Sequence, residues 1–391
     1  MTEIARGLAG IVITETRLSR VDGEAGELII AGFPLEELAP NATFEEVLFL
    51  LWNDRLPTTA ELDVLKSLMT PKRNLSPEIL SLLRSAAERK VPTMDALRVG
   101  VDALSLEDED PVDNSVEANQ RRAVSITAAS PTIVANYWRL LQGQAPIEPD
   151  ASLDHSANYL YMLSGKVPHP DAVRGLETYL NTVVDHGMNA STFTSRVIIS
   201  TQSDMYSAVV GAIGALKGPL HGGAPGPALD MVFEIQARAK DSGRSIEAEA
   251  DDYVTEVVSS GGRIMGFGHR VYQVRDPRAD VLGEAADKLF TGTGDTKLYE
   301  NARVVEDVVL QSLEELKPGR NLQTNVEFYT ALVLHGVGLE TELFTPTFAI
   351  ARTGGWAANV LEQIEEARLI RPRVAYIGEL DRKWVPIEER K

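Results

Sequence analysis

Apolar side chains recur every three or four positions over most of the chain, which is the spacing of helices with one buried face. Two Thr-x-x-Glu capping boxes, Thr43 with Glu46 and Thr58 with Glu61, mark where two such helices begin. Ser76 as an N-cap, with Pro77 at the first helical position, marks the start of a third. Longer stretches with the same period predict further helices over residues 94–104, 118–141, 152–163, 172–184, 203–216, 247–259, 280–289, 298–316, 326–334 and 345–365.

A β pattern is confined to the start of the chain. Short apolar runs at 11–13 and 28–30 flank a turn signal at 21–23, which predicts a small hairpin. The sequence therefore predicts a mainly α fold and argues against the parallel sheet of a dinucleotide-binding protein. Neither a GxGxxG nor a GxxxxGK[ST] motif occurs. Polar stretches at 107–113, 142–150 and 291–296 are expected to be exposed loops.

Composition narrows the class of protein. The 391 residues are 44% hydrophobic and 24% charged, as in an ordinary globular protein of one large domain plus a smaller one. No apolar run approaches a membrane span, and we expect no signal peptide. The chain has no cysteine, which excludes disulfides and Cys-based zinc sites and favours a cytoplasmic location. The net charge of −19 disfavours nucleic acid and anionic membranes as partners.

Three of the six histidines lie among glycines or small polar residues. His186 lies in the polar run 185–192, which a helix cap with a turn would also explain. His221 lies in 218–225, where glycines and prolines let a large ligand approach, although an ordinary Gly-Pro loop is the alternative. His269 lies between Gly268 and a basic stretch.

The remaining histidines have simpler interpretations. His155 and His169 are expected to be solvated or to cap helices, and His335 is expected to act at a helix C-terminus.

The segment from Arg263 to Arg278 reverses the sign of the surrounding charge. It contains four arginines and one aspartate in a chain of net charge −19. A positive pocket in a negative protein attracts small anions such as carboxylates and phosphates. A solvated helix end would explain the charges but not the two glycines before His269.

These three histidine segments, in this order, resemble the citrate synthase family. Residues 266–269, continuing to Asp276-Pro277-Arg278, fit the family's signature, and the segments around His221 and His186 fit two further landmarks. The resemblance extends from Arg6-Gly7-Leu8 to Ile370-Arg371-Pro372-Arg373, and the length is similar to that of the shorter, dimeric branch.

The resemblance implies condensation of acetyl-CoA with oxaloacetate to give citrate and CoA. It implies no metal and no permanently bound cofactor, with the CoA thioester as co-substrate. His221 would be the neutral donor to the enolate oxygen, and His269 would polarise the ketone of oxaloacetate. Each such donor is worth about 3 to 4 kcal/mol of transition-state stabilisation.

The same resemblance supplies the residues that bind oxaloacetate. His186 would hold the substrate from another side, and Arg278 and Arg352 would bind its carboxylates. Arg371 would do the same from the other subunit, so the resemblance implies a homodimer with shared active sites.

The resemblance also implies a CoA segment and two domains. Gly266, Phe267 and Gly268 would present backbone to the adenine, and Arg270 would contact a phosphate. Residues 1–220 and 333–391 would form a large helical domain, and 221–332 a small domain that closes over the site.

The catalytic base departs from the family pattern. The family has an aspartate in Asn-Val-Asp, whereas this chain has Asn325-Val326-Glu327. A side chain one methylene longer moves the carboxylate by about 1 Å unless the backbone retreats, and such a displacement can cost ~100-fold in rate. Either Glu327 is the base on an adjusted backbone, which we favour because the other landmarks are intact, or the chain is an altered condensing enzyme.

Two other functions remain open at this stage. A 2-methylcitrate synthase would use propionyl-CoA, and one methylene in a pocket discriminates only ~10- to 200-fold. A non-catalytic protein that binds an anion or CoA would account for the altered base.

Overall fold

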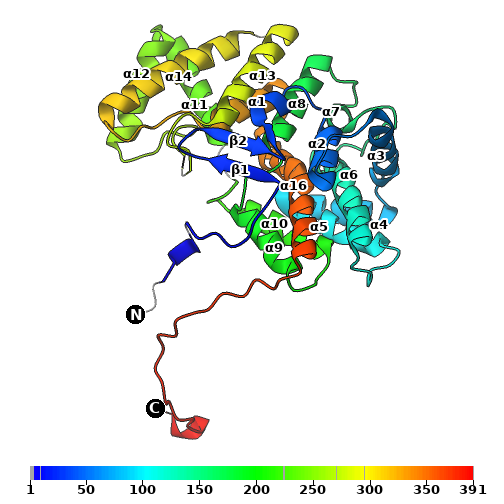
Figure 1. Cartoon of the computed structure of the whole chain (residues 1–391). Coiled ribbons are helices and arrows are strands. Elements are labelled where there is room, and N and C mark those ends of the chain that lie inside the picture. Colours follow the sequence, from blue (N-terminus) through cyan, green and yellow to red (C-terminus); the bar gives the residue numbers. More distant parts are fainter. Residues whose placement is uncertain (1–3, 9, 223–224, 270, 295, 391) are drawn as a thin grey trace.

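The computed structural model describes residues 4–8, 10–222, 225–269, 271–294 and 296–390. It confirms the predicted mainly helical fold with a small N-terminal antiparallel sheet (Figure 1). The α-helices are α1 Leu35–Leu38, α2 Phe44–Asn53, α3 Thr59–Lys72, α4 Pro77–Glu88, α5 Thr93–Ala103, α6 Val116–Leu141, α7 His155–Ser164, α8 Pro170–Val183, α9 Ala190–Ile199, α10 Met205–Leu216, α11 Pro225–Ser242, α12 Ile246–Ser259, α13 Pro277–Thr293, α14 Thr296–Leu316, α15 Val326–Gly336 and α16 Phe344–Glu366. Short 3₁₀ helices cover Arg6–Leu8, Leu104–Glu107, Thr341–Leu343 and Ile387–Glu389.

The N-terminal sheet differs in detail from the predicted hairpin. Strands β1 (Ser19–Asp22), β2 (Glu27–Ile30) and β3 (Phe33–Pro34) pair antiparallel in chain order. Residues 11–13, predicted as the first strand, lie outside the sheet. The strand begins later because Asp22 makes the turn itself: its Oδ1 accepts from Ala25 N at 2.9 Å, and Gly26 closes the turn at φ +70°.

The predicted helices are confirmed with small shifts at their ends. Both capping boxes form, with Thr43 accepting from Glu46 N and Thr58 from Glu61 N. Three helices, α1, α9 and α11, were not among those predicted. The loop expected at 291–296 is shorter, because α13 continues to Thr293 and α14 begins at Thr296.

Two histidines outside the three segments have different outcomes. His169 caps α8 as predicted, because its Nδ1 accepts from Asp171 N at 3.3 Å. The prediction for His155 was wrong, because this residue is 2% exposed and its ring packs 5.0 Å from that of Phe44. It lies in the first turn of α7, which faces the start of α2 instead of solvent.

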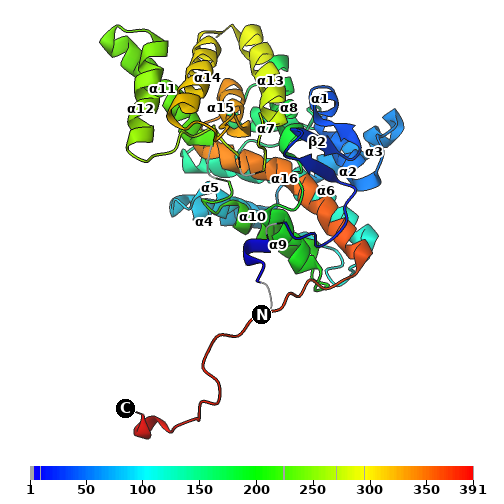
Figure 2. The ribbon, with the colours of Figure 1, turned by 60° about the vertical axis from the view of Figure 1, so that its left-hand side comes forward.

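Helix α16 crosses the middle of the molecule and is buried along most of its length (Figures 1 and 2). It packs on α6, α8, α9 and α10. Two glycines allow close contacts of α16: a Cβ on Gly355 would lie 2.0 Å from Val184 O at the end of α8, and one on Gly354 would lie 2.2 Å from Leu48 Cδ2 on α2. This approach brings Arg352, one turn earlier on α16, beside the segment that carries His186.

Helices α11 to α15 gather at one end of the molecule in both views (Figures 1 and 2). Within this group α12 packs on α14 and α11, and α13 packs on α15. The group meets the other helices mainly where α13 and α15 contact α8. His221 lies in the turn that leads into this group, His269 and Glu327 lie within it, and His186 follows α8, the helix that the group contacts.

Candidate active site

His221 lies in the turn between α10 and α11 and is held as a neutral donor. Its Nε2 is 2.9 Å from Ser191 Oγ and accepts from Ser191 N at 3.3 Å. Because a backbone N–H can only donate, Nε2 carries no proton, and the single ring proton lies on Nδ1. Burial, and then the charge of Arg352, lower the pKa of His221. The ring is therefore neutral near pH 7, with one N–H to offer.

The partner of His221 is itself fixed by two other groups. Ser191 Oγ accepts from Trp356 Nε1 on α16 at 3.1 Å and lies 2.8 Å from Asn189 Oδ1. Asn189 is the N-cap of α9, and its side chain also accepts from Thr192 N at 3.1 Å. The run Asn189 to Thr192, which the sequence singled out beside His186, thus also orients His221.

His269 is neutral with the opposite tautomer. Its Nδ1 accepts from Val271 N at 3.0 Å and from Tyr272 N at 3.1 Å, so the ring proton lies on Nε2. Burial and the nearby Arg278 lower the pKa of His269 to about 4. Arg278 Nη2 lies 3.4 Å from His269 Nε2. Two donors therefore meet at one point, which suits a carbonyl or carboxylate oxygen that accepts from both.

His186 follows the end of α8 and lies next to His269. The two rings are 6.1 Å apart edge to face, and His186 Nε2 is 3.1 Å from the hydroxyl of Tyr272. Burial, then the charges of Arg278 and Arg352, hold the pKa of His186 well below its usual range. This ring is also neutral at physiological pH.

Two buried arginines supply the positive charge. Arg278 forms a two-point pair with Asp276, with Nη2 to Oδ2 at 2.7 Å and Nε to Oδ1 at 3.0 Å. Arg352 donates from Nε to the carbonyl of Val183, while its Nη1 is buried without a partner among the described residues. Burial lowers the pKa of Arg352 to about 10, which still leaves it charged at neutral pH. An unpartnered guanidinium nitrogen here suits an anionic ligand.

Glu327 lies in the first turn of α15. Burial, assisted by Asp276 and opposed by Arg278 and Arg352, raises the pKa of Glu327 to about 7. Among the described residues, none donates a hydrogen bond to its carboxylate. A carboxylate with these properties is suited to accept a proton from a ligand near neutral pH.

The segment that carries Glu327 is tied to the glycines before His269. Asn325 caps α15 by accepting from Glu327 N at 2.9 Å, and its Nδ2 donates to Gly268 O at 2.8 Å. Asn325 N also donates to Gly266 O at 2.9 Å. Gly266 and Gly268 have φ of +87° and +82°, values that favour glycine, so this close pairing depends on both. The hydrogen bonds between Asn325 and the glycine segment therefore position both Glu327 and His269.

A cavity of about 570 Å³ opens beside this glycine segment. Gly266, Phe267 and Gly268 line it together with His269 and Asn325. Its rim also carries three cations that the sequence analysis did not assign: Arg263, Lys317 and Arg320. The last two lie after the end of α14 and were missed because nothing in the linear sequence links them to residues 263–269. Arg270, predicted to contact a phosphate, lies outside the described residues.

Arg371 is the one predicted site residue in the described part of the chain that does not join the cluster. It lies on an exposed tail after α16, and in Figures 1 and 2 this tail runs away from the body of the molecule. Within one chain, Arg371 therefore has no access to the histidines.

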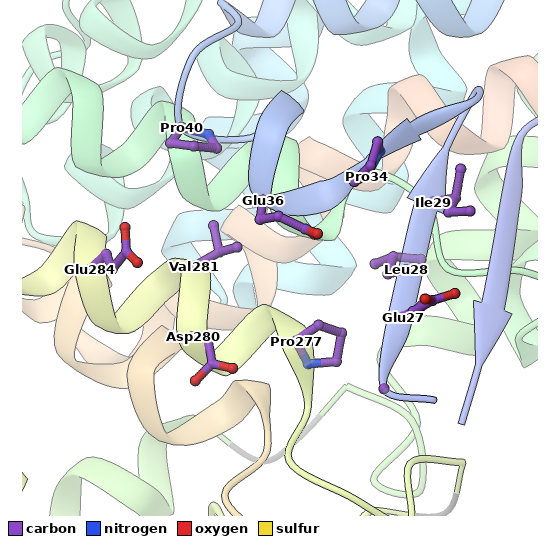
Figure 3. Close-up of a pocket in the computed structure, with 11 residues that line it drawn as sticks. Glu27, Leu28, Ile29, Pro34, Glu36, Pro40, Pro277, Asp280, Val281 and Glu284 are labelled. Carbon is purple, nitrogen blue, oxygen red and sulfur yellow. The ribbon is translucent and has the colours of Figure 1, made fainter. Parts of the chain in front are cut away.

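A second groove in the structure lacks the histidines and arginines of this cluster. A groove of about 400 Å³ lies between the sheet, α1 and α13, and Figure 3 shows Glu27, Glu36, Asp280 and Glu284 around it. This groove contains none of the predicted site residues.

Among the described residues, no group of three His, Asp or Glu side chains is placed to hold a metal ion. No helix in the described part of the chain is long and apolar enough to cross a membrane.

Comparisons with known proteins identify the family of the chain. The family model described as "Citrate synthase, C-terminal domain" matches residues 7–373. The chain is 41% identical over 391 residues to citrate synthase from Haloferax volcanii, covering 99% of both chains. It is 36% identical to 2-methylcitrate synthase from Mycobacterium tuberculosis, covering 96% of this chain and 91% of that one.

A solved structure with ligands is also similar. Citrate synthase from Thermoplasma acidophilum, in a ternary complex with carboxymethyl coenzyme A and oxaloacetate, superposes with a TM-score of 0.87. The two chains are 30% identical, and the match covers 100% of each. The sequence resemblance, the helical architecture and the full-length matches lead to one conclusion: this chain belongs to the citrate synthase family.

Proposed function

We propose that this protein condenses acetyl-CoA with oxaloacetate to give citrate and CoA. The observation that carries the proposal is a carboxylate, Glu327, whose pKa is raised to about 7 in the same cluster as two neutral imidazoles with fixed tautomers. The charge of Arg352 acts on the pKa of both His221 and Glu327, so these groups share one small region. Enolate chemistry needs this set: a base near neutral pH and uncharged donors for developing oxyanions.

The proposed reaction begins at Glu327, which takes a proton from the methyl group of the acetyl thioester. Nδ1–H of His221 donates to the thioester oxygen as the enolate forms. Nε2–H of His269 and the guanidinium of Arg278 polarise the ketone oxygen of oxaloacetate, and the enolate carbon attacks the ketone carbon. Water then cleaves the citryl thioester and releases CoA. Both histidines act as neutral donors, in line with their lowered pKa values.

Charge and burial support the proposed oxaloacetate site. Arg278 and Arg352 are buried, His186 beside them is half-buried, and Arg352 Nη1 has no protein partner among the described residues. The substrate's carboxylates would supply the missing acceptor. CoA would occupy the cavity beside Gly266, Phe267 and Gly268, with the cations on its rim near the phosphates.

The proposed domains are those expected from the sequence: residues 1–220 with 333–391, and 221–332. The mutual packing of α11 to α15 supports this division, as does the concentration of their contacts with the other helices at α8. His221 and Glu327 then lie near the two crossings, so closure would bring them together and exclude water.

We also propose a homodimer and a cytoplasmic location. The tail after α16 exposes large apolar side chains, with Val374 at 93%, Ile377 at 95% and Trp384 at 78%. Exposed apolar groups on an extended arm are typical of a segment that packs on another subunit. A partner's tail would also supply Arg371 to the site. Acetyl-CoA and oxaloacetate form inside cells, which favours the cytoplasm.

The test is release of the CoA thiol with oxaloacetate and either acetyl-CoA or propionyl-CoA. We expect a higher kcat/KM with acetyl-CoA. The likeness to a 2-methylcitrate synthase favours measurable release with propionyl-CoA too, and a preference for that donor would reassign the acyl substrate. If neither donor releases CoA, the chain is a binding protein and the proposed reaction is wrong.

A further inference from the structure

Tyr272 lies at the centre of the site, yet neither the sequence analysis nor the proposed reaction gives it a role. It is 3% exposed. Its ring centroid lies 5.0 Å from that of His269 and 5.7 Å from that of His186. The guanidinium carbon of Arg278 lies 5.7 Å from the same ring. One side chain therefore contacts three of the groups proposed to surround oxaloacetate: His186, His269 and Arg278.

The hydroxyl of Tyr272 makes its one polar contact in this cluster with His186 Nε2, at 3.1 Å. Burial raises the pKa of the phenol further above its usual range, so the hydroxyl keeps its proton throughout the working pH range. It can therefore form a hydrogen bond with His186 in either tautomer of that ring. Among the described residues, no other side chain forms a hydrogen bond with the ring of His186, which follows the last turn of α8 and precedes Gly187 at φ +60°.

The backbone of Tyr272 has a separate function. Its N–H donates to His269 Nδ1 at 3.1 Å and so helps fix the proton of His269 on Nε2. A change to the side chain leaves this bond in place. The two functions of Tyr272 can therefore be separated experimentally.

We propose that Tyr272 is a positioning residue for oxaloacetate, whose hydroxyl holds the ring of His186 in the orientation that binds the substrate. The proposal rests on the proposed function, because it assigns oxaloacetate to this pocket. Without the hydroxyl, the ring of His186 can rotate. Oxaloacetate then binds more weakly, because binding must fix the ring in one orientation at a cost in entropy. The acetyl-CoA side, which uses His221 and Glu327, is not affected.

The test is Tyr272→Phe, which keeps the ring and the backbone N–H. We expect the KM for oxaloacetate to rise about five- to twentyfold, the weight of one buried hydrogen bond, with kcat and the KM for acetyl-CoA within about twofold of wild type. Calorimetric titration with oxaloacetate alone should show the same loss of affinity. An unchanged oxaloacetate KM and Kd would overturn the proposal.

Tyr137→Phe is the matched control. Tyr137 is fully buried on α6, and its hydroxyl donates to the carbonyl of Val91, away from the histidines. Removing that hydroxyl should lower the melting temperature and leave both KM values unchanged. If Tyr272→Phe behaved in the same way, its hydroxyl would be purely structural.

A double-mutant cycle tests whether Tyr272 acts through His186. Tyr272→Phe in a His186→Gln background should add less than about twofold to the oxaloacetate KM, because the partner is already lost. Fully additive effects would contradict the proposed route. Failure of the proposed function is a separate outcome, since wild-type enzyme would then release no CoA at all.

Discussion

At the scale of single residues, the longer side chain of Glu327 is the least expected feature of the site. Its carboxylate is half-buried beside two arginines and Asp276, and burial outweighs the arginines in raising its pKa to about 7. The cap by Asn325 and the pairing of Asn325 N with Gly266 O fix the backbone of this turn. A base of this kind works only when it is deprotonated.

The rate should therefore depend on pH through Glu327. We expect kcat/KM for acetyl-CoA to rise with pH through about 7 and to level off above it, as the carboxylate loses its proton. Glu327→Gln should lower kcat by ~100- to 10,000-fold and remove this limb of the profile. Glu327→Asp should retain the limb with a kcat lower by ~100-fold, since the shorter side chain misplaces the base. Near-normal turnover by Glu327→Gln would remove Glu327 from the mechanism.

The raised pKa of Glu327 also makes a prediction about stability. The folded protein holds this proton more tightly than the unfolded chain, so stability is lost as pH rises from about 4.5 to about 7. Glu327→Gln mimics the protonated form. It should be more stable than wild type by about 1–3 kcal/mol at pH 8, and little different at pH 4.5.

Thermal denaturation at the two pH values measures this difference. Glu24→Gln, on the exposed turn after β1, is the control and should change the melting temperature little at either pH. An equal effect of Glu327→Gln at pH 4.5 and pH 8 would show that burial does not shift the ionisation of Glu327.

At the scale of elements, the cap of α15 joins folding to catalysis. Asn325→Ala removes the hydrogen bond to Glu327 N and the one to Gly268 O. We expect a loss of about 1 kcal/mol in stability and a fall of ~10- to 100-fold in kcat as the base is displaced.

Thr58→Ala is the matched control for Asn325→Ala. Thr58 caps α3 with a similar side-chain bond, on an exposed helix start outside the histidine cluster. It should lose similar stability, measured by denaturant unfolding, while kcat stays unchanged. Equal kcat in the two variants would show that the cap of α15 has no role in placing Glu327.

Sequence signals predicted an element well when the whole signal lies within a few consecutive residues. The capping boxes at Thr43 and Thr58 needed four residues each, and both form. Helix α11 was missed because it begins with Pro225-Gly226-Pro227, which indicates a loop. Helix α9 was missed because the stretch of its sequence with helically spaced apolar residues is short. His155 was expected to be solvated or to cap a helix because the residues that pack against it, such as Phe44, lie far away in sequence.

Prediction of the site was likewise limited to what lies within short sequence segments. The sequence motifs identified His186, His221, His269 and Glu327, which the fold brings into one region. The tautomers that make these histidines neutral donors depend on contacts from other elements, such as Ser191 N at His221. The cations at Lys317 and Arg320 were missed for the same reason, because they reach the glycine segment only in three dimensions.

At the scale of the whole molecule, charge is distributed unevenly. The net charge of −19 is combined with buried Arg278 and Arg352 and with the cations around the cavity beside Gly266. A surface of this net charge repels polyanions, while the positive interior of the site would attract the proposed dianion and phosphorylated thioester. One arginine of the proposed set, Arg371, lies outside the site on the exposed tail, so the proposed reaction depends on the proposed dimer.

Subunit mixing tests whether two chains share each site. Glu327→Gln and Arg371→Ala homodimers should each be nearly inactive. In a mixed dimer, the chain with Arg371→Ala keeps its own Glu327 and receives Arg371 from its partner, so one of the two sites is complete. An equal mixture formed by co-expression should recover about a quarter of wild-type activity, because half the dimers are mixed and each has one working site. If Arg371 served its own chain instead, both sites of the mixed dimer would be defective and no activity would return.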